Sequence, residues 1–473
     1  METECRAAQL TFQGLGRRTV VAEFSAGRLS SDAGGLLLLR EVAERSGLLR
    51  RLAQCFRDHR APEQIEHTVE ELLAQRVLAQ ACGYEDLNDH DVLRDDALLA
   101  AAAGKTDPTG AQRRRARDRG HGGAGKSTLN RLEGTPADAT ATARYKKIVY
   151  DGAAIERLFV DAFLDAHPTP PPEIVLDLDA TDDPLHGQQE GRFFHGYYRS
   201  YCYLPLYIFA GDFLLCAKLR TADGDGAAGA VEEVARIVGQ LRARWAAVPI
   251  VVRADSGFAR EALMAWCEAH GVDFVLGLAR NARLEAALTA ELAEARAAAE
   301  ATGAPARVYK DFVYQTRTTW SRSRRVVGKA EQLPGKANPR FIVTSFAPAR
   351  WAPAALYEDV YCARGDMENR IKEQQLGLFA DRTSTATMRS NQLRLWIASV
   401  AYVLVHELRR VGLQGTELAR AQVGTIRTRL LKVGGLIRLS VRRVAIALSS
   451  VFPLQRLFAA ALANVQRAYP LRC

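Results

Sequence analysis

Residues 173–183 read Glu-Ile-Val-Leu-Asp-Leu-Asp-Ala-Thr-Asp-Asp, an apolar run that is interrupted by acids. Its composition predicts a buried β-strand. Strand alternation places Asp177 and Asp179 on one face and the leucines around them on the other. A carboxylate in such a strand is costly to bury unless it is paired or binds a metal. Asp182 and Asp183 better suit the capping of a turn, so the first two acids mark a candidate functional site.

The sequence around this strand predicts a mixed α/β sheet. Residues 201–220 predict two strands, 231–246 a helix, 249–257 a strand that ends in Asp255, and 273–280 another strand. Strands that come first and then alternate with helices favour a mixed sheet flanked by helices.

The rest of the chain suggests three regions. Residues 1–165 are expected to be a mainly helical N-terminal DNA-binding region, since 34–56 and 63–83 repeat apolar residues at helical spacing. A catalytic domain is expected over 170–405, with a β-rich insertion at about 281–335 and a charged helix over 357–378 followed by an apolar one over 393–408. Residues 406–473 form a basic C-terminal tail that suits a strand or helices with a basic face.

Composition indicates a globular protein with a polyanionic partner. The chain has 473 residues, 48% of them hydrophobic, and a net charge of +10, which favours nucleic acid. No two of its eight cysteines have zinc-site spacing, so reduced and mostly buried thiols are expected. The N-terminus has no secretory signal pattern and no segment is long enough to span a bilayer, so we expect a cytoplasmic, nucleoid-associated protein without a membrane partner.

A glycine- and arginine-rich stretch, 107–134, predicts a basic linker that runs into a short helix at 127–133. A phosphate backbone is its natural counterpart. Gly120, Gly125, Lys126 and Ser127 match a nucleotide-binding loop, but that loop must follow a buried strand, and an arginine run precedes it here. Nucleoside-triphosphate binding is therefore not expected.

Two further acids lie at the ends of core elements. Asp255 follows an apolar strand, where an Asp often only caps the next helix. On a helix of about 100° per residue, Tyr361, Arg364, Glu368 and Lys372 share one face. A solvated helix with chance charge spacing is the alternative.

Taken together, these motifs resemble insertion-sequence transposases of the DDE type, group 1, in the branch whose third motif is Tyr-x2-Arg-x3-Glu-x6-Lys. Asp179-Ala180-Thr181 resembles the first motif, Asp255 the second, and Tyr361, Arg364 and Glu368 the third. The final Lys of the motif would fall at Gln375, so its role could shift to Lys372.

The resemblance implies a ribonuclease-H-like catalytic domain that cleaves transposon ends and transfers them into target DNA. It implies two Mg²⁺ (or Mn²⁺) ions held by Asp179, Asp255 and Glu368. It also implies phosphate contacts from Arg364, strand positioning by Tyr361, and a homodimer bound to terminal repeats and target DNA. Two alternatives remain: a nuclease of this fold without strand transfer, and a non-catalytic, transposon-derived DNA-binding protein.

Two aromatic groups are candidate DNA contacts. Trp320, among arginines of the insertion, could stack on an extruded base, or it could anchor the insertion to the core. The stretch 192–205 mixes aromatics with His195 and Arg199, and most of its rings are expected to be core strand residues.

Overall fold

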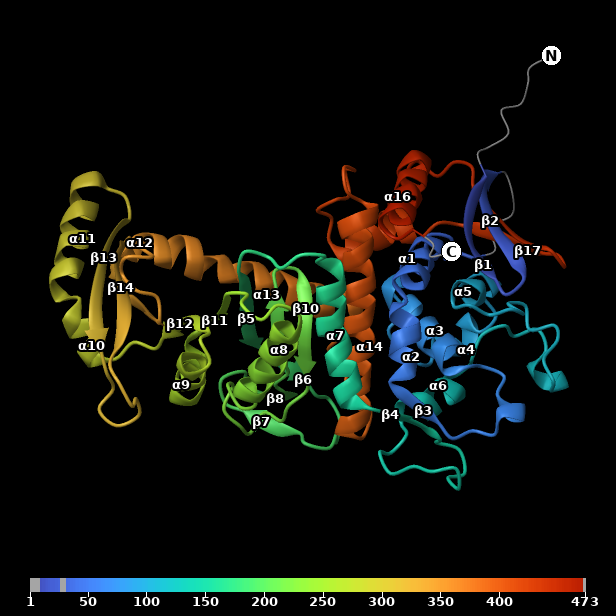
Figure 1. The fold of residues 1–473 in the computed structure, drawn as a ribbon, viewed down its shortest axis with the longest axis horizontal. Helices are drawn as coiled ribbons and strands as arrows, with labels where there is room; N and C mark the ends of the chain where they lie inside the picture. The colour runs from blue at the N-terminus through green and yellow to red at the C-terminus, as the bar shows by residue number, and fades with distance from the viewer. Residues whose placement is uncertain (1–8, 26–30, 471–473) are drawn as a thin grey trace, which may run out of the picture. The chain divides into compact units, whose positions relative to one another are not determined.

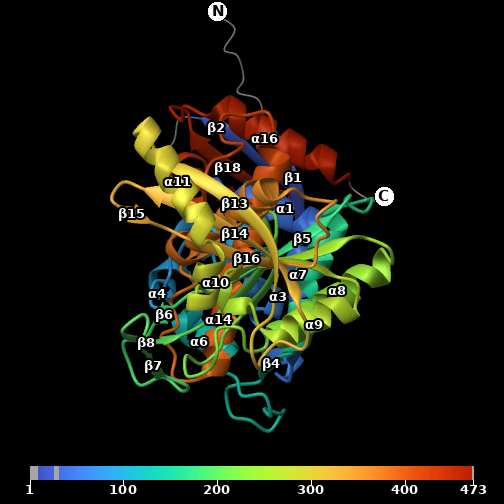
Figure 2. The same cartoon turned by 90° about the vertical axis from the view of Figure 1, so that its left-hand side faces the viewer.

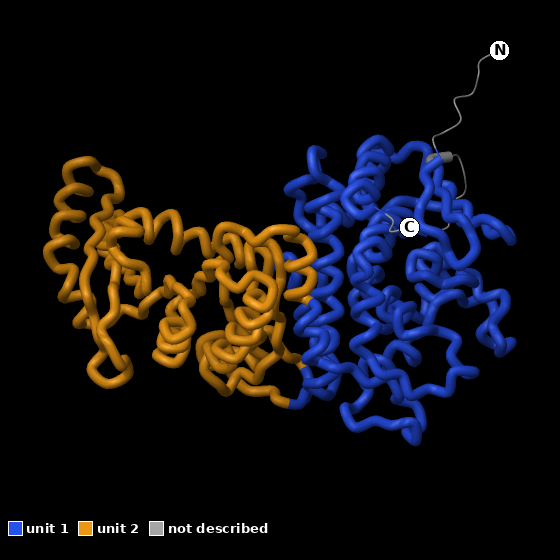
Figure 3. Tube along the Cα trace, in the orientation of Figure 1, with its two compact units in different colours: residues 1–158, 187–190, 372–473 blue, residues 159–186, 191–371 orange. Residues whose placement is uncertain are grey.

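The computed structural model describes residues 9–25 and 31–470. The chain divides into two compact units (Figure 3): unit 1 comprises residues 1–158, 187–190 and 372–473, and unit 2 comprises 159–186 and 191–371. The C-terminal region therefore belongs to the same unit as the N-terminal region. The expected catalytic span, 170–405, differs from this division, because the chain passes into unit 1 at residue 372.

Unit 2 is built on a nine-stranded sheet with the order β10-β9-β5-β11-β12-β16-β14-β13, in which β15 pairs with β14 (Figure 1). Strand β5 is parallel to β11, and β11 to β12; the other pairs are antiparallel. The prediction of a mixed α/β fold is confirmed. The strands are β5 (Ile174–Ala180), β9 (Leu206–Ala210), β10 (Phe213–Lys218), β11 (Ile250–Ala254), β12 (Asp273–Leu278), β13 (Ala306–Tyr314), β14 (Arg324–Leu333), β15 (Lys336–Ala337) and β16 (Arg340–Thr344).

The two faces of this sheet have different covers. Ile174, Leu176 and Leu178 lie in the larger core cluster, whereas Val175 packs against a smaller one, as strand alternation predicts. The larger cluster is covered by the second half of α7 (Gly152–Ala166), α8 (Ala230–Arg244), α9 (Glu261–Ala269), α10 (Ala282–Ala287) and α11 (Thr289–Thr302). Leu356 and Tyr357 from the start of the third-motif helix cover the other face.

The predicted insertion extends the main sheet. Strands β13 and β14 form the expected hairpin, and β14 also pairs with β16. Helix α11 lies along β13 and β14 (Figure 2). The sequence alternation therefore identified the hairpin but not its pairing partner, because that partner lies beyond the hairpin in the chain.

Unit 1 combines helices with a small sheet. Helix α3 (Val69–Cys82) begins at Thr68, whose side chain and that of Glu71 form a capping box. It packs against α14 (Met388–Glu407), which is buried on most sides. The other helices of eight or more residues are α1 (Leu36–Ser46), α6 (Lys126–Glu133) and α16 (Gln455–Ala468); shorter ones are α2 (Leu48–Gln54), α4 (His90–Leu93), α5 (Ala97–Ala102) and α15 (Val423–Ile426).

The N-terminal region is mainly helical, as expected, but it also contributes strands. Strands β1 (Leu10–Leu15) and β2 (Arg18–Ser25) form a four-stranded sheet with β18 (Arg443–Ser449) and β17 (Gly435–Leu439). Strand β2 is parallel to β18, so its partner comes from the other end of the chain. Local periodicity could not predict that pairing. A further pair joins β3 (Phe56–Asp58) to β4 (Ile148–Tyr150).

The described cysteines agree with the expectation of mostly buried thiols. Five of the six described free cysteines are buried, and Cys362 is exposed; Cys5 and Cys473 lie outside the described residues. No helix among the described residues is both long enough and apolar enough to cross a lipid bilayer.

Candidate functional site

Asp179 lies near the end of β5, where the strand leaves the core. Its Oδ1 accepts a hydrogen bond from the backbone N–H of Ala180 at 2.9 Å. Burial raises the pKa of Asp179 to about 6, opposed by the charge of Arg364 and reinforced by Asp255 and Glu368. Asp255 and Glu368 are thus close enough to Asp179 to affect its pKa.

Asp177 has a different role from Asp179. Both of its carboxylate oxygens accept from Arg253 on β11, at 2.5 Å from Nε and 2.8 Å from Nη2. Arg253 also donates through Nη1 to the carbonyl of Val360, at 2.5 Å. This bidentate pair satisfies the buried carboxylate and ties the sheet to the residue before Tyr361. Sequence reasoning missed Arg253, although a charged residue within an apolar strand signals that it needs a partner.

Asp255 follows β11 and caps a short 3-10 turn, η3 (Ser256–Phe258), by accepting from the N–H of Gly257 at 2.8 Å. The capping alternative is therefore correct for one oxygen of this carboxylate. Gly277 on β12 permits the close approach here, because a Cβ there would lie 2.6 Å from the Tyr361 hydroxyl and 2.8 Å from the Ser256 nitrogen. Sequence reasoning also missed this glycine.

The third motif is helical but irregular. A π-helical segment, η4 (Leu356–Tyr361), leads through a 3-10 turn, η5 (Cys362–Arg364), into α13 (Gly365–Lys372). A short helix, α12 (Pro353–Ala355), precedes it and a second π-helical segment, η6 (Glu373–Gly377), follows. The expected 100° per residue therefore holds within α13, which carries Glu368 and Lys372, but not for Tyr361 and Arg364, which lie in the π-helical and 3-10 segments before it. Such changes of winding are frequent at functional sites.

Arg364 is the centre of the acid cluster. Its Nη1 lies 3.6 Å from Oδ2 of Asp179, and its Nη2 lies 3.3 Å from Oε1 of Glu368. Burial lowers the pKa of Arg364, but the charges of Asp179, Tyr361, Asp255 and Glu368 outweigh this effect and raise it overall. The arginine therefore stays charged and compensates acids that would otherwise repel one another. We call Asp179, Asp255, Glu368 and Arg364 the acid site.

The acid site has suitable donors for a hard divalent cation. Its side-chain donors are carboxylate oxygens, which Mg²⁺ and Mn²⁺ prefer. Oδ1 of Asp179 accepts the backbone hydrogen bond at the end of β5, whereas Oδ2 faces Arg364. Within the described residues, however, no group of three or more His, Cys, Asp or Glu side chains lies together in a way that could hold a metal ion.

The other candidate residues lie elsewhere. Lys372 is exposed and belongs to unit 1. Trp320 is only 6% exposed and lies in the larger core cluster, edge-on to Tyr314 at 5.7 Å. This placement favours the anchoring alternative for Trp320 over base stacking.

The aromatic stretch 192–205 corrects a second expectation. Cys202 and Tyr203 are fully buried, but the rings of Phe193, Phe194, Tyr197 and Tyr201 are exposed. The stretch forms a small sheet of β6 (Asp183–Pro184), β8 (Ser200–Tyr203) and β7 (Phe193–His195). Four of its six Phe and Tyr rings are therefore exposed and are not core residues.

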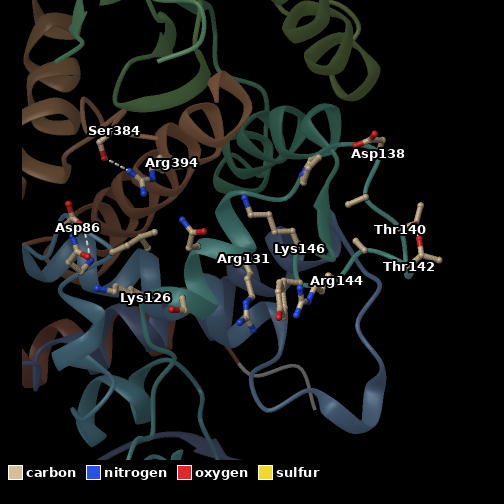
Figure 4. Close-up of a pocket in the computed structure, with 18 residues that line it drawn as sticks. Asp86, Lys126, Arg131, Asp138, Thr140, Thr142, Arg144, Lys146, Ser384 and Arg394 are labelled. Carbon is tan, nitrogen blue, oxygen red and sulfur yellow. Dashed lines mark hydrogen bonds between the residues drawn. The ribbon is translucent and has the colours of Figure 1, made fainter. Parts of the chain in front are cut away.

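Unit 1 contains a separate basic cavity of about 1000 Å³ (Figure 4). Helix α6, which confirms the predicted short helix, lines one wall together with the loop from 136 to 146. The helix follows the glycine-rich stretch, and the element before it in the chain is a 3-10 turn, η2 (Ala116–Asp118). Gly122 is packed so tightly that a Cβ would lie 1.9 Å from the carbonyl oxygen of Pro108. This loop is not a strand-to-helix phosphate cradle.

The cations of the cavity differ in their pairing. Lys126 pairs with Asp91 at 3.0 Å and Arg394 with Glu133 at 2.7 Å. Arg131, Arg144 and Lys146 are exposed, and the described residues give none of them an ion pair. Arg131 and Arg144 both lie over the ring of Tyr145, at 5.0 and 4.9 Å from its centroid. The cavity thus combines uncompensated positive charge with an exposed aromatic ring.

The sequence matches the family model of the transposase DDE domain, group 1, over residues 12–470, nearly the whole chain. No curated protein matches it significantly. The chain belongs to this transposase family, a class of enzymes whose partner is DNA.

Proposed function

We propose that the acid site is the catalytic centre of a metal-dependent DNA transposase that cleaves transposon ends and transfers them into target DNA. The observation that carries the proposal is the position of Arg364, 3.6 Å from Asp179 and 3.3 Å from Glu368, with Asp255 near enough to raise its pKa. The strand order β10-β9-β5-β11-β12, with β5, β11 and β12 parallel, supports a ribonuclease-H-like core. Its acids then come from the ends of neighbouring parallel strands and from one helix.

Asp179, Asp255 and Glu368 would hold two Mg²⁺ or Mn²⁺ ions in this mechanism. Such ions activate a water or a 3′-hydroxyl and stabilise the leaving oxygen during an in-line attack on phosphorus. Arg364 would exchange its carboxylate contacts for phosphate oxygens when DNA binds, since a guanidinium pairs with either group. Tyr361 would position the strand beside it.

DNA would also contact unit 1. The unpaired cations of the basic cavity, Arg131, Arg144 and Lys146, support the proposal that the N-terminal region holds the phosphate backbone of the terminal repeats. Lys372 remains a proposed DNA contact. Joining two ends to a target would require a homodimer in the DNA complex.

The test is to incubate the purified protein with DNA from the ends of its own element, with and without Mg²⁺. We expect cleaved ends that become joined to target DNA only when the metal is present. Asp179→Asn, Asp255→Asn and Glu368→Gln should abolish both steps and preserve DNA binding, whereas Asp359→Asn, an exposed acid on η4, should remain active.

The products separate the alternatives. Cut ends that never join a target would indicate a nuclease without strand transfer. Binding without metal-dependent nicking would indicate a non-catalytic DNA-binding protein. Cleavage by the three acid variants at the wild-type rate would contradict the assignment of the site.

A further inference from the structure

The hairpin of β7 and β8 presents an exposed aromatic surface. Phe194 pairs across the strands with Tyr201, and their ring centroids lie 5.5 Å apart. Phe194 is 56% exposed, Tyr201 43% and Tyr197, in the turn that follows β7, 84%. Phe193 is exposed on the opposite face of β7, where it pairs with Cys202. We call Phe194, Tyr197 and Tyr201 the aromatic platform. Exposed aromatic surface of this kind usually marks a binding site.

The platform stands on a well-defined backbone. Arg199 takes a left-handed conformation, with φ of 53°, and its N–H donates to the carbonyl of His195 at 2.8 Å. Cys202 on β8 packs in a small core with Leu204 and Ala222. The outward rings are therefore presented by a closed turn whose inner side is buried.

The tip of the hairpin lies beside the acid site. The hydroxyl of Tyr198 donates to the carbonyl of Ala180, the residue after Asp179, at 3.5 Å. Burial raises the pKa of Tyr198 to about 12, and the charges of Asp182, Asp179 and Asp255 reinforce the rise. A strand bound at the acid site would therefore pass close to the platform.

The charge of the hairpin suits a nucleic acid. From Gly191 to Tyr203 the sequence contains no Asp or Glu. The guanidinium carbon of Arg192 lies 3.6 Å from the ring centroid of Tyr201, and Arg199 is exposed at the turn. Aromatic rings stack on bases while neighbouring cations bind the backbone, a combination typical of single-strand binding surfaces.

We propose that the aromatic platform stacks on unpaired bases of the DNA strand whose phosphate occupies the acid site. The inference rests on the proposed function and adds the form of the substrate: a DNA end with separated strands. Base pairs in a duplex stack on one another and hide their faces, so the platform requires bases that have left the stack. It therefore favours frayed or overhanging ends over blunt duplex.

The experiment compares two metal-free DNA ligands of the same end sequence, one blunt and one with a short 3′ overhang that carries 2-aminopurine. Wild-type protein should bind the overhang about tenfold more tightly and quench the fluorescence of the 2-aminopurine through stacking. The triple variant Phe194→Ala/Tyr197→Ala/Tyr201→Ala should lose both effects. The matched variant Tyr197→Phe/Tyr201→Phe retains its rings and should keep them.

Equal binding of both ligands by the wild type, or an unchanged preference in the alanine variant with an unaltered melting temperature, would overturn the proposal. So would an alanine variant that changes self-association in sedimentation and leaves DNA binding intact, because the platform would then be a contact between copies of the chain. None of these measurements requires cleavage. If the overhang stacks on the protein but the DNA is never cut, the proposed catalytic function is wrong, while the proposal that the aromatic platform binds unpaired bases is supported.

Discussion

The guanidinium of Arg364 lies 3.6 Å from the carboxylate of Asp179 and, through its other terminal nitrogen, 3.3 Å from Glu368. One cation thus links an acid at the end of a strand to an acid on the third-motif helix. The arrangement stabilises converging negative charges in the free protein. It also places a phosphate-binding group where the proposed function requires the DNA backbone.

The pair of Asp177 and Arg253 should position the third motif. Asp177→Asn should lower the free energy of unfolding by about 3 kcal/mol, because it leaves a buried guanidinium without its counter-charge. It should also slow cleavage, since Arg253 holds the carbonyl beside Tyr361. The surface control Asp273→Asn, which loses an exposed contact to Arg350, should change stability by less than about 1 kcal/mol. Denaturant titrations and cleavage rates check both; an Asp177 variant as stable and active as the control would contradict this role.

Gly277→Ala should impair the acid site. The new methyl group would meet the backbone nitrogen of Ser256 at 2.8 Å, so the loop that carries Asp255 must move. We expect at least a tenfold loss of cleavage rate. Gly239→Ala on α8 is the matched control, because it meets nothing within 4 Å and should stabilise the helix by about 0.5–1 kcal/mol. Full activity of the Gly277 variant would show that this close approach is not required.

The basic cavity of unit 1 should contribute sequence-independent affinity for DNA. The triple variant Arg131→Ala/Arg144→Ala/Lys146→Ala should weaken the binding of end DNA and of random DNA by the same factor. The slope of log Kd against log salt concentration should become shallower by an amount that corresponds to the loss of up to about three phosphate contacts. The variant Arg420→Ala/Arg438→Ala/Arg442→Ala removes the same charge from exposed positions outside the cavity. Fluorescence anisotropy at several salt concentrations compares the two. If both variants lost the same DNA affinity, the loss would follow from net charge and not from the cavity.

His90 should make the protein sensitive to acid. It is fully buried, and Nδ1 accepts from Nε2 of Gln75 at 2.9 Å. Burial lowers the pKa of His90 from 6.5 to about 3, with a further contribution from Arg76. Below pH 6.5 the histidine of the unfolded chain therefore binds a proton, while His90 in the folded protein stays neutral down to about pH 3. The free energy of unfolding is thus unaffected by this group above pH 6.5 and decreases as the pH falls from 6.5 toward 3. The slope is about 1.4 kcal/mol per pH unit.

His90→Asn should reduce that slope in denaturation experiments between pH 4 and 6. His67, which burial also gives a pKa of about 3, remains to titrate in the variant and keeps part of the acid sensitivity. An identical pH dependence in wild type and variant would contradict the assignment.

The sequence predicted the elements that follow from local periodicity. Strand alternation around Asp179 placed its leucines and its acids on the correct faces, and the capping box at Thr68 begins a helix that the apolar spacing indicated. The resemblance to the transposase motifs predicted that Asp179, Asp255, Arg364 and Glu368 belong to one site, and the structure places Arg364 beside Asp179 and Glu368.

Features that depend on distant partners could not be predicted. Strand β2 pairs with β18 from the opposite end of the chain, and Asp177 is satisfied by Arg253 from another strand. Tyr197 is exposed because it lies in the turn between β7 and β8, whereas composition alone suggested a core strand. Burial is a property of the assembled fold, so aromatic content could not decide it.

The most direct test of the central claim is the number of Mn²⁺ ions that bind the protein in complex with pre-cleaved end DNA, measured by electron paramagnetic resonance. We predict two ions for the wild type and for Asp359→Asn, and fewer for Asp179→Asn, Asp255→Asn and Glu368→Gln. Two ions in all of these proteins would show that the metal is held elsewhere and would contradict the acid site as the catalytic centre.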